Sequence, residues 1–369
     1  MTLLFYITGH GFGHATRTLA VIEKVLALQP GARIVIRTSV PEWFLKRSGP
    51  PSLEVQVMEA DTGVVQVDGL VIDEATTATR AAAFYQTFDA RVAEEAAVIR
   101  HGVDVVVGDV PPLAFPAAHA AGVPSVALAN FTWDWIYQFY PEFEAMAPGV
   151  IAKMTRAYGA ATLALRMPFA GGFQAMLPVT RDIPLVARHS RFGRERARQM
   201  LGLTSDQPIV LASFGGHRTA VPYGDIARRC RITLLLTDWE ARAGDRDEAS
   251  NLHRYSADAL ERLGLRYEDL VAAADLVVSK PGYGIVSECV ANQTALLYTS
   301  RGAFAENDVI VPEMARVIRC GFIPQEQLRA GDWEGSIRAL LRQPPPVESR
   351  GVDGAEVAAQ AILALARSA

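Results

Sequence analysis

The sequence predicts an α/β protein with two similar-sized domains that face each other across a cleft. Short apolar runs of strand length alternate with segments of helical periodicity, an order typical of parallel sheets covered by helices. Several of these runs lead into a glycine-rich turn at the start of the next helix. The length of 369 residues fits about two domains, and the arginines around Pro184 in residues 181–194 indicate a linker between them.

The first half opens with a strand, a loop, a helix and a second strand. Residues 3–8 are continuously apolar, as expected for a strand covered on both faces, and residues 15–28 have the apolar spacing of a helix. With a second strand at 33–38, this order predicts a right-handed βαβ unit. We expect further strands at 53–58, 103–108 and 125–129, one long helix or two over 73–100, and a helix at 113–121.

The second half again alternates predicted strands and helices, after a helix at 194–203. Strands are expected at 209–213, 232–236, 275–278 and 295–298, with a short helix at 267–273 and a polar loop that ends at 306–308. An amphipathic helix is expected at 352–366. We therefore expect a first domain over 1–185, a second over 186–350, and a final segment, 351–369, whose helix packs back on the first domain.

Composition excludes several classes of protein. The 36 basic and 40 acidic residues give a net charge of −4, which argues against a nucleic-acid-binding surface. The three cysteines are scattered without a CxxC pair and indicate reduced thiols in a cytoplasmic protein. The N-terminus has the pattern of a first strand rather than a signal peptide, and no apolar run reaches the roughly 18–20 residues of a membrane helix. A peripheral membrane contact stays possible, and the oligomeric state is open.

The N-terminal glycine loop carries two histidines. Its spacing over residues 9–14 is close to GxGxxG, but no acid follows at 36–39, which disfavours a dinucleotide site. His14 would lie at a helix start, where the helix dipole lowers the imidazole pKa and favours a neutral general base. Asp109, at the end of a predicted strand, could orient it. On the acceptor side we expect residues His10, Gly11 and Arg17.

The stretch 279–308 has the features of a nucleotide site. Pro281, Gly282 and Gly284 precede a helix whose N-terminus suits a diphosphate, and Glu288 could accept hydrogen bonds from a ribose diol. An earlier turn can hold phosphate oxygens through Ser213, Gly215 and Gly216. The polar end of this stretch consists of Glu306, Asn307 and Asp308, which could either bind sugar hydroxyls or cap a helix. An aromatic run offers either an acceptor wall or core packing, through residues Trp133 and Trp135.

These passages resemble GT-B-fold glycosyltransferases. The likeness is to the GlcNAc transferase that completes the lipid-linked peptidoglycan precursor and to the glycosyltransferase-like N-terminal region of plant arabinokinases. The glycine–histidine loop with Ala15-Thr16-Arg17, the passage from 183–188 to 201–203, and the stretch 279–308 carry the resemblance. It implies two Rossmann-like domains, the first binding an acceptor and the second a nucleotide sugar.

The resemblance also implies residue roles. It places His14 near the reacting centre, Arg188 on the diphosphate, and Arg266 and Tyr267 at the base of the donor. The activity implied is a hexosyltransferase that uses a nucleotide diphosphate sugar, with UDP-sugar as the first expectation. The acceptor would be a small molecule, a glycan or a lipid-linked hydroxyl compound. No paired-acid DxD motif is placed to hold a metal, so we expect neither a metal nor a separate cofactor.

Two alternatives stay open. A nucleotide-sugar epimerase or hydrolase could use the same fold, and the chain could instead be a non-catalytic module that binds nucleotide sugars. The glycine–histidine loop has His10 and Phe12 where the peptidoglycan enzyme has small residues, and the polar end of 279–308 lacks the glutamine common in relatives. The donor sugar, its base, the acceptor and the stereochemical outcome are therefore not specified by the sequence.

Overall fold

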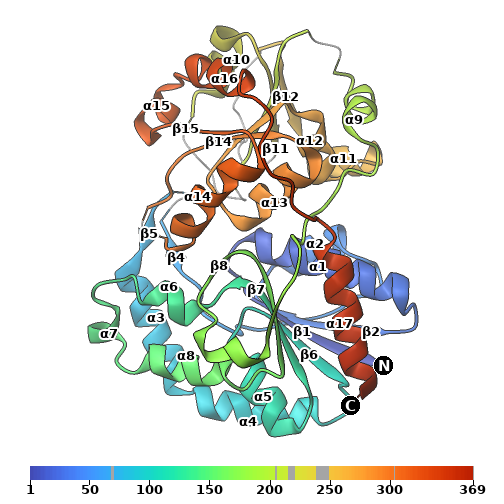
Figure 1. Ribbon diagram of the computed structural model, residues 1–369, viewed down its shortest axis with the longest axis vertical. Helices are drawn as coiled ribbons and strands as arrows, with labels where there is room; N and C mark the ends of the chain where they lie inside the picture. The colour runs from blue at the N-terminus through green and yellow to red at the C-terminus, as the bar shows by residue number, and fades with distance from the viewer. Residues whose placement is uncertain (68–69, 204–205, 215–220, 238–248, 303, 369) are drawn as a thin grey trace.

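The computed structural model describes residues 1–67, 70–203, 206–214, 221–237, 249–302 and 304–368. It has two α/β domains stacked along the long axis of the molecule, with the N-terminal domain at the bottom of Figure 1 and the C-terminal domain above it. Each domain contains one parallel sheet, as the alternation of strands and helices predicts.

The N-terminal sheet has seven strands in the order β3-β2-β1-β6-β7-β8-β9, all paired in parallel. Its strands are β1 (Thr2–Ile7), β2 (Arg33–Thr38), β3 (Glu54–Val57), β6 (Val105–Asp109), β7 (Ser125–Phe131), β8 (Leu163–Gly171) and β9 (Thr180–Asp182). A small antiparallel pair consists of β4 (Val65–Gln66) and β5 (Ile72–Asp73). The helices are α1 (Phe12–Leu28), α2 (Glu42–Ser48), α3 (Glu74–Gln86), α4 (Phe88–Ile99), α5 (Ala114–Ala121), α6 (Trp133–Tyr137), α7 (Phe143–Met146), α8 (Val150–Tyr158) and a 3₁₀ turn (Gln174–Val179).

The continuous apolar run of β1 is explained by burial on both faces. Leu3, Phe5 and Ile7 belong to the core shared with α1, whereas Leu4 and Tyr6 belong to the core under α3, α4 and α5. Because successive side chains of a strand point to opposite faces, a strand covered on both sides needs apolar residues at every position. β1 is also an interior strand of the sheet, paired with β2 on one side and β6 on the other.

The C-terminal sheet has six parallel strands in the order β12-β11-β10-β13-β14-β15. They are β10 (Ile209–Ala212), β11 (Thr233–Thr237), β12 (Leu252–Tyr255), β13 (Leu276–Ser279), β14 (Ala295–Tyr298) and β15 (Cys320–Phe322). The helices are α9 (Arg194–Met200), α10 (Tyr223–Cys230), α11 (Ala257–Arg262), α12 (Tyr267–Ala273), α13 (Tyr283–Asn292), α14 (Glu306–Val317), α15 (Gln325–Ala330) and α16 (Glu334–Leu341). In both sheets the loops at the carboxyl ends of the central strands point toward the other domain.

The last helix, α17 (Gly354–Ser368), crosses back and packs along α1. The segment before it is held to the linker, because Leu185 N donates to Gly351 O at 3.0 Å and Gly354 N donates to Leu185 O at 3.0 Å. Apolar residues of α17 such as Ile362 are buried in the same core as β1. The predicted return of the C-terminal helix to the N-terminal domain is therefore confirmed.

The structure decides one open alternative and adjusts two local expectations. Residues 73–100 form two helices, α3 and α4, the second of the two arrangements expected there. Helix α1 begins at Phe12, earlier than the expected residue 15, so that His14 lies in its first turn. The stretch expected as a polar loop up to Asp308 instead begins helix α14 at Glu306, with acids in its first turn where the helix dipole favours them.

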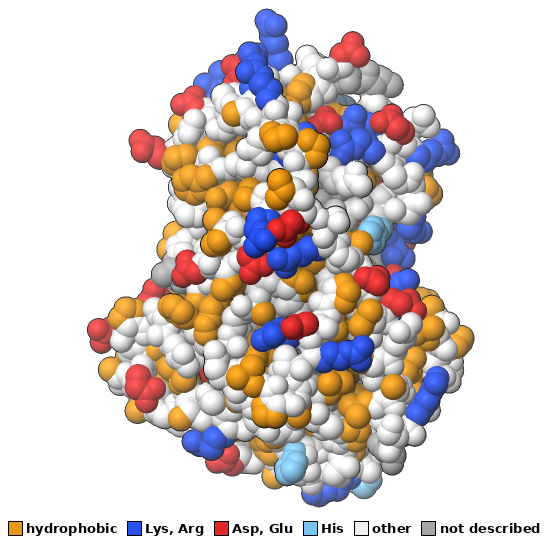
Figure 2. Space-filling model, viewed as in Figure 1, with side chains coloured by type: hydrophobic (Ala, Val, Ile, Leu, Met, Phe, Trp, Pro, Cys, Tyr) orange, Lys and Arg blue, Asp and Glu red, His pale blue; other side chains and the backbone are white. Residues whose placement is uncertain are grey.

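On the face in Figure 2, acidic and basic side chains are interspersed, without a broad field of positive charge. None of the helices in the described part of the chain is both long enough and apolar enough to cross a membrane.

Candidate functional site between the domains

A cavity of about 830 Å³ lies between the two domains. The N-terminal domain lines it with the loop before α1 and the first turns of that helix, and the C-terminal domain with the starts of α12 and α13. The cavity has the size of a pocket for a small molecule or cofactor. Residues expected in the site that line it are His10, Gly11, His14, Arg17, Arg188, Ser213, Arg266, Tyr267, Gly282, Gly284, Glu288 and Glu306.

His14, Arg17 and Asp109 form one buried cluster on the N-terminal side of this cavity. His14 Nδ1 lies 2.8 Å from Asp109 Oδ1, and Arg17 donates to both carboxylate oxygens, through Nε at 2.7 Å and Nη2 at 2.5 Å. Thr18 Oγ1 adds a hydrogen bond to Asp109 at 2.8 Å. The expectation that Asp109 lies next to His14 holds geometrically: Asp109 ends β6, and β6 pairs with β1, which precedes α1.

The charges in this cluster are set by burial and by the pairing. Burial, followed by the charge of Arg17, lowers the pKa of His14 and outweighs the opposite effect of Asp109. Burial alone would raise the pKa of Asp109, but Arg17 and His14 outweigh it and lower the pKa to about 2. At neutral pH the cluster therefore contains a neutral imidazole, a carboxylate and a guanidinium.

Nδ1 of His14 has two neighbours at hydrogen-bond distance. Arg17 Nη2 lies 2.9 Å from it and can only donate, whereas Asp109 Oδ1 at 2.8 Å can only accept. The tautomer protonated on Nδ1 donates to Asp109, and the tautomer protonated on Nε2 accepts from Arg17. A general base at Nε2 requires the first of these, in which Nε2 carries the lone pair.

A chain of hydrogen bonds connects this cluster with the C-terminal domain. Arg17 Nη1 donates to Asn130 Oδ1 at 2.6 Å, and Asn130 Nδ2 donates to Glu306 Oε1 at 2.8 Å. The other oxygen of Glu306 accepts from Arg301 Nη2 at 2.7 Å. All four side chains are buried. Glu306, expected at the donor sugar, therefore lies close to the predicted base, although 292 residues separate it from His14 in the sequence.

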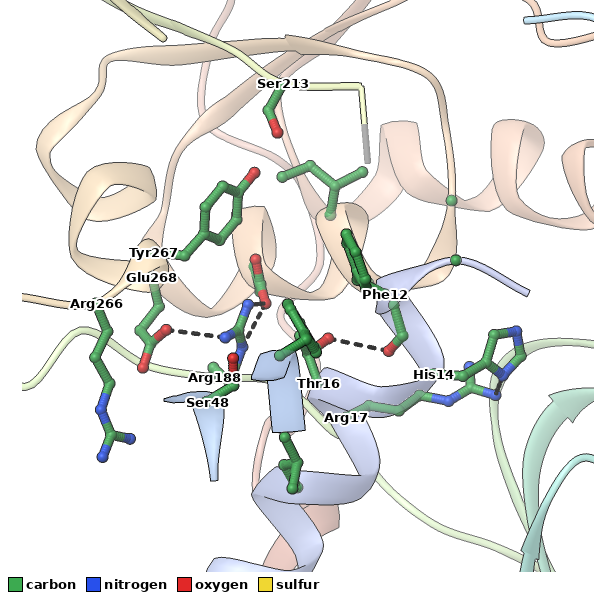
Figure 3. A pocket seen from close by; sticks show the side chains of 18 of the residues that line it. Phe12, His14, Thr16, Arg17, Ser48, Arg188, Ser213, Arg266, Tyr267 and Glu268 are labelled. Atoms are coloured by element: carbon green, nitrogen blue, oxygen red, sulfur yellow. Dashed lines mark hydrogen bonds and ion pairs between the residues drawn. The ribbon is translucent and has the colours of Figure 1, made fainter. Parts of the chain in front are cut away.

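Arg188 forms a second charged cluster on the donor side. Its Nε donates to Glu288 Oε1 at 2.7 Å, and Nη1 lies 3.1 Å from Glu268 Oε2. Figure 3 shows Arg188 beside Glu268. Burial would lower the pKa of Arg188, but Glu288 and Glu268 outweigh it and raise the pKa. Two carboxylates therefore already offset the charge of this guanidinium, which was expected on the diphosphate.

The glycine turn before α13 meets the first turn of α1. Gly282 is the N-cap of α13 and offers no side chain to the free N–H groups of the first turn. A Cβ at Gly284 would lie 3.5 Å from the Cα of Gly13, which shows how closely the two helix starts approach. The exposed N–H groups and the helix dipole make this end of α13 suitable for an anion. Pro281 is buried just before it and does not line the cavity.

Some of the other residues expected in the site line the cavity and others do not. Ser213, Arg266 and Tyr267 line the cavity, and the exposed Arg266 pairs with Glu23 of α1 at 2.9 Å. Gly215 and Gly216 lie outside the described residues. Asn307 and Asp308 follow Glu306 along α14 and do not line the cavity.

The two tryptophans expected to form an acceptor wall do not line either cavity described for this structure. Trp133 is completely buried, and its Nε1 donates to Asp61 Oδ2 at 2.8 Å. Trp135 is half-buried against Gly171, where a Cβ would lie 2.3 Å from the ring. The structure therefore shows the core-packing alternative for both side chains, because their ring faces are covered by neighbouring backbone and side chains.

Sequence reasoning missed several residues that the structure brings to the site. They are Asn130, Glu268, Lys280 and Arg301, of which the last three line the cavity. Lys280 and Arg301 lie within the stretch 279–308 and follow strands β13 and β14, so their position at the carboxyl ends of parallel strands was the available signal. Asn130 had the same signal, because it follows the predicted strand 125–129 and lies at the carboxyl end of β7, whereas Glu268 had no comparable signal.

A metal site is not evident in the part of the chain that the structure describes. No three His, Cys, Asp or Glu side chains are grouped there as ligands. The metal-independent reaction expected from the sequence stays a prediction.

No family model matches the chain. Among curated proteins, it is 28% identical over 375 residues to the L-arabinokinase of Arabidopsis thaliana, a match that covers 97% of this chain and 34% of that protein. It is 27% identical over 313 residues to the UDP-N-acetylglucosamine–N-acetylmuramyl-(pentapeptide) pyrophosphoryl-undecaprenol N-acetylglucosamine transferase of Clavibacter michiganensis, covering 81% of this chain and 76% of that enzyme. The chain thus spans about a third of the arabinokinase.

Solved structures match over both domains. The glycosyltransferase SnogD from Streptomyces nogalater gives a TM-score of 0.56 at 16% identity, covering 99% of each chain. The chain has the GT-B fold. A second GT-B structure, Phytolacca americana UGT2 complexed with UDP-2-fluoroglucose and pterostilbene, gives a TM-score of 0.57 at 14% identity, covering 100% of this chain and 94% of that one. Both structural likenesses are likenesses of fold, at 16% and 14% identity.

Proposed function

We propose that this GT-B protein transfers a sugar from a nucleoside diphosphate sugar to a hydroxyl acceptor, with His14 as general base. One observation carries the proposal: a neutral imidazole held by Asp109 faces the same cavity as the open N-terminus of α13. The first is what an acceptor hydroxyl needs, and the second is what a departing diphosphate needs. A UDP-sugar is the first donor to test, because the Clavibacter relative is named for UDP-N-acetylglucosamine and UGT2 is complexed with a UDP-sugar.

The transfer balances as follows. The acceptor oxygen forms a bond to the anomeric carbon while the bond from that carbon to the diphosphate oxygen breaks. The acceptor proton passes to His14 Nε2, and the electron pair of the broken bond leaves with the nucleoside diphosphate. Asp109 stabilises the imidazolium, and the N–H groups at the start of α13 stabilise the diphosphate.

The donor would be held by residues that line the cavity from the C-terminal domain. Glu288 lines the cavity from α13 and would hold the ribose diol, while Leu265, Arg266 and Tyr267 line it where the base would bind. Glu306 and Arg301 would face the transferred sugar near His14. The cysteines Cys230, Cys289 and Cys320 are free thiols, which supports the cytoplasmic location proposed for the reaction.

The function is tested by donor turnover and nucleotide binding. The protein is incubated with UDP-, GDP- and dTDP-sugars, with and without a mixture of hydroxyl acceptors, and nucleoside diphosphate release is measured. We expect release that depends on the acceptor, and a rise in thermal stability with the matching nucleoside diphosphate. Isomerisation of the sugar without transfer would instead identify an epimerase, and tight nucleotide binding without any turnover would identify a binding module.

Glu288→Ala is expected to weaken nucleotide binding by about 1–3 kcal/mol, since ribose hydroxyls would lose their acceptor in a buried site. Isothermal titration calorimetry with UDP measures the change. Glu268→Ala is the matched control, because Glu268 also pairs with Arg188 and also lines the cavity. A loss of similar size in both variants would show that the effect comes from releasing Arg188 rather than from the ribose, and unchanged affinity of the Glu288 variant would remove this residue from the site.

A further inference from the structure

A second, smaller cavity of about 340 Å³ lies in the N-terminal domain beyond His10. His10, Gly11 and Gln66 line both cavities, so the smaller one continues from the acceptor side of the larger one. The ring of His10 is 5.4 Å from that of Trp133, and the ring of His14 is 6.5 Å from the same tryptophan. His10, which lines the smaller cavity, and His14, the predicted base, therefore both lie close to the ring of the buried Trp133.

The lining of the small cavity is mostly polar. Its polar residues beyond the glycine loop are Ser39, Glu59, Asp61, Thr62, Gln66 and Arg80, and Val64 and Val65 are its apolar ones. Arg80 and Glu59 form an ion pair at 2.6 Å at its edge. Hydroxyl, amide, carboxylate and guanidinium groups offer both donors and acceptors to a molecule with several hydroxyl groups, whereas two valines give an aromatic or isoprenoid group little apolar surface to bury against.

Asp61 is fixed at the inner wall of this cavity. Its residue exposure is 5%, and its two carboxyl oxygens accept from Thr8 Oγ1 at 2.8 Å and from Trp133 Nε1 at 2.8 Å. Each oxygen retains a second lone pair for a ligand. Burial raises the pKa of Asp61 to about 7, so the carboxyl can either accept or donate a hydrogen bond near neutral pH. The mechanism proposed for the larger cavity does not use this group.

We infer that the acceptor is a compact polyhydroxylated molecule, of the size of a monosaccharide or a cyclitol. Its non-reacting hydroxyls bind in the small cavity through Asp61 and the Glu59–Arg80 pair, and one hydroxyl remains at His14 Nε2. The inference rests on the proposed function. It selects among the acceptors that the sequence leaves open, and it disfavours lipid-linked and aromatic ones.

The test compares acceptor classes with one active donor. Glucose, galactose and myo-inositol represent polyols, 4-nitrophenol an aromatic acceptor, and farnesol in detergent a lipid, with nucleoside diphosphate release as the readout. We expect transfer to at least one polyol, and we expect Asp61→Asn and Glu59→Gln each to raise its KM about tenfold or more while the donor KM changes less than twofold. Asp89→Asn, on the exposed side of α4 with 86% side-chain exposure, is the matched control and should change neither KM.

The outcomes separate this inference from the proposed function. Asp61→Asn loses one of its two internal hydrogen bonds, so its thermal stability is measured first; Glu59→Gln, in which the side chain is half-exposed, tests the cavity if the former does not fold. Transfer only to 4-nitrophenol or farnesol, or an unchanged polyol KM in the folded variants, would overturn the inference and leave the transferase intact. Failure to bind any nucleotide or turn over any donor would overturn the proposed function, and the inference with it.

Discussion

Replacing His14 by glutamine is expected to lower kcat by about 10²–10⁴-fold, the usual contribution of a general base. Glutamine keeps a polar side chain at the start of α1 but cannot accept the proton of the acceptor hydroxyl. Nucleotide binding should persist, because His14 belongs to the N-terminal domain and the proposed nucleotide contacts to the C-terminal domain. Steady-state kinetics with an accepted donor–acceptor pair, together with calorimetry of UDP binding, measure both quantities.

The pH profile of the same reaction is an internal check on this assignment. Because burial and Arg17 lower the pKa of His14 below 6.5, the unprotonated base should persist below that pH, and kcat/KM should fall only in more acidic solution. Asp109→Asn is the matched variant, since asparagine can no longer hold the proton on Nδ1 by accepting with a full charge. Activity of the His14 variant within threefold of the unaltered protein would exclude His14 as the base.

Replacing Arg17 by methionine is expected to lower the free energy of unfolding by about 3–5 kcal/mol, the cost of leaving one partner of a buried ion pair alone. Asp109 has no exposed surface, and Arg17 supplies two of its hydrogen bonds. Methionine keeps much of the side-chain volume, so that the loss reports on charge rather than on a cavity. Urea unfolding followed by circular dichroism measures the difference.

Arg228→Met is the control for this experiment, because Arg228 pairs with Asp225 on the exposed face of α10 and should contribute less than about 1 kcal/mol. The pairing also predicts the sign of a pH effect. The pKa of Asp109, lowered from 3.8 to about 2 in the folded protein, contributes stability above pH 3.8 that is lost as the pH falls from 3.8 toward 2. A loss below 1 kcal/mol in Arg17→Met would show that Asp109 needs no countercharge in the folded state.

The hydrogen-bond chain from Arg17 through Asn130 to Glu306 gives the cleft a defined geometry. It joins the cluster of the predicted base to the first residue of α14 in the other domain. Because these side chains are buried away from water, each depends on its partner in the chain for its hydrogen bonds. The position of Glu306 relative to His14 is thus fixed by the closed arrangement of the domains, which is how a residue expected to read the donor sugar comes to lie beside the acceptor base.

The central strands of both sheets and helices such as α1, α12 and α13 could be predicted because their signals are local. The apolar run at the N-terminus is long enough to identify a strand buried on both faces, and β2, β14 and α12 have the predicted limits or nearly so. The glycine turn before Tyr283 identified the start of α13, because glycine at a helix N-terminus and apolar spacing after it are properties of neighbouring residues. The start of α14 at Glu306 was less clear, since acidic residues serve equally in a polar loop and in the first turn of a helix.

By itself, the sequence determined the two α/β domains, the glycine-rich helix starts and the candidates His14, Asp109 and Glu288. Only the tertiary structure decided which of them meet. It placed Asp109 on His14 across 95 residues, paired Arg188 with Glu288 across 100, and put the ring of Trp133 in the core with its Nε1 on Asp61. The physical reason is that secondary structure follows from the conformational preferences of adjacent residues, whereas charge pairing and burial depend on the order of strands in the sheet and on the closure of one domain against the other.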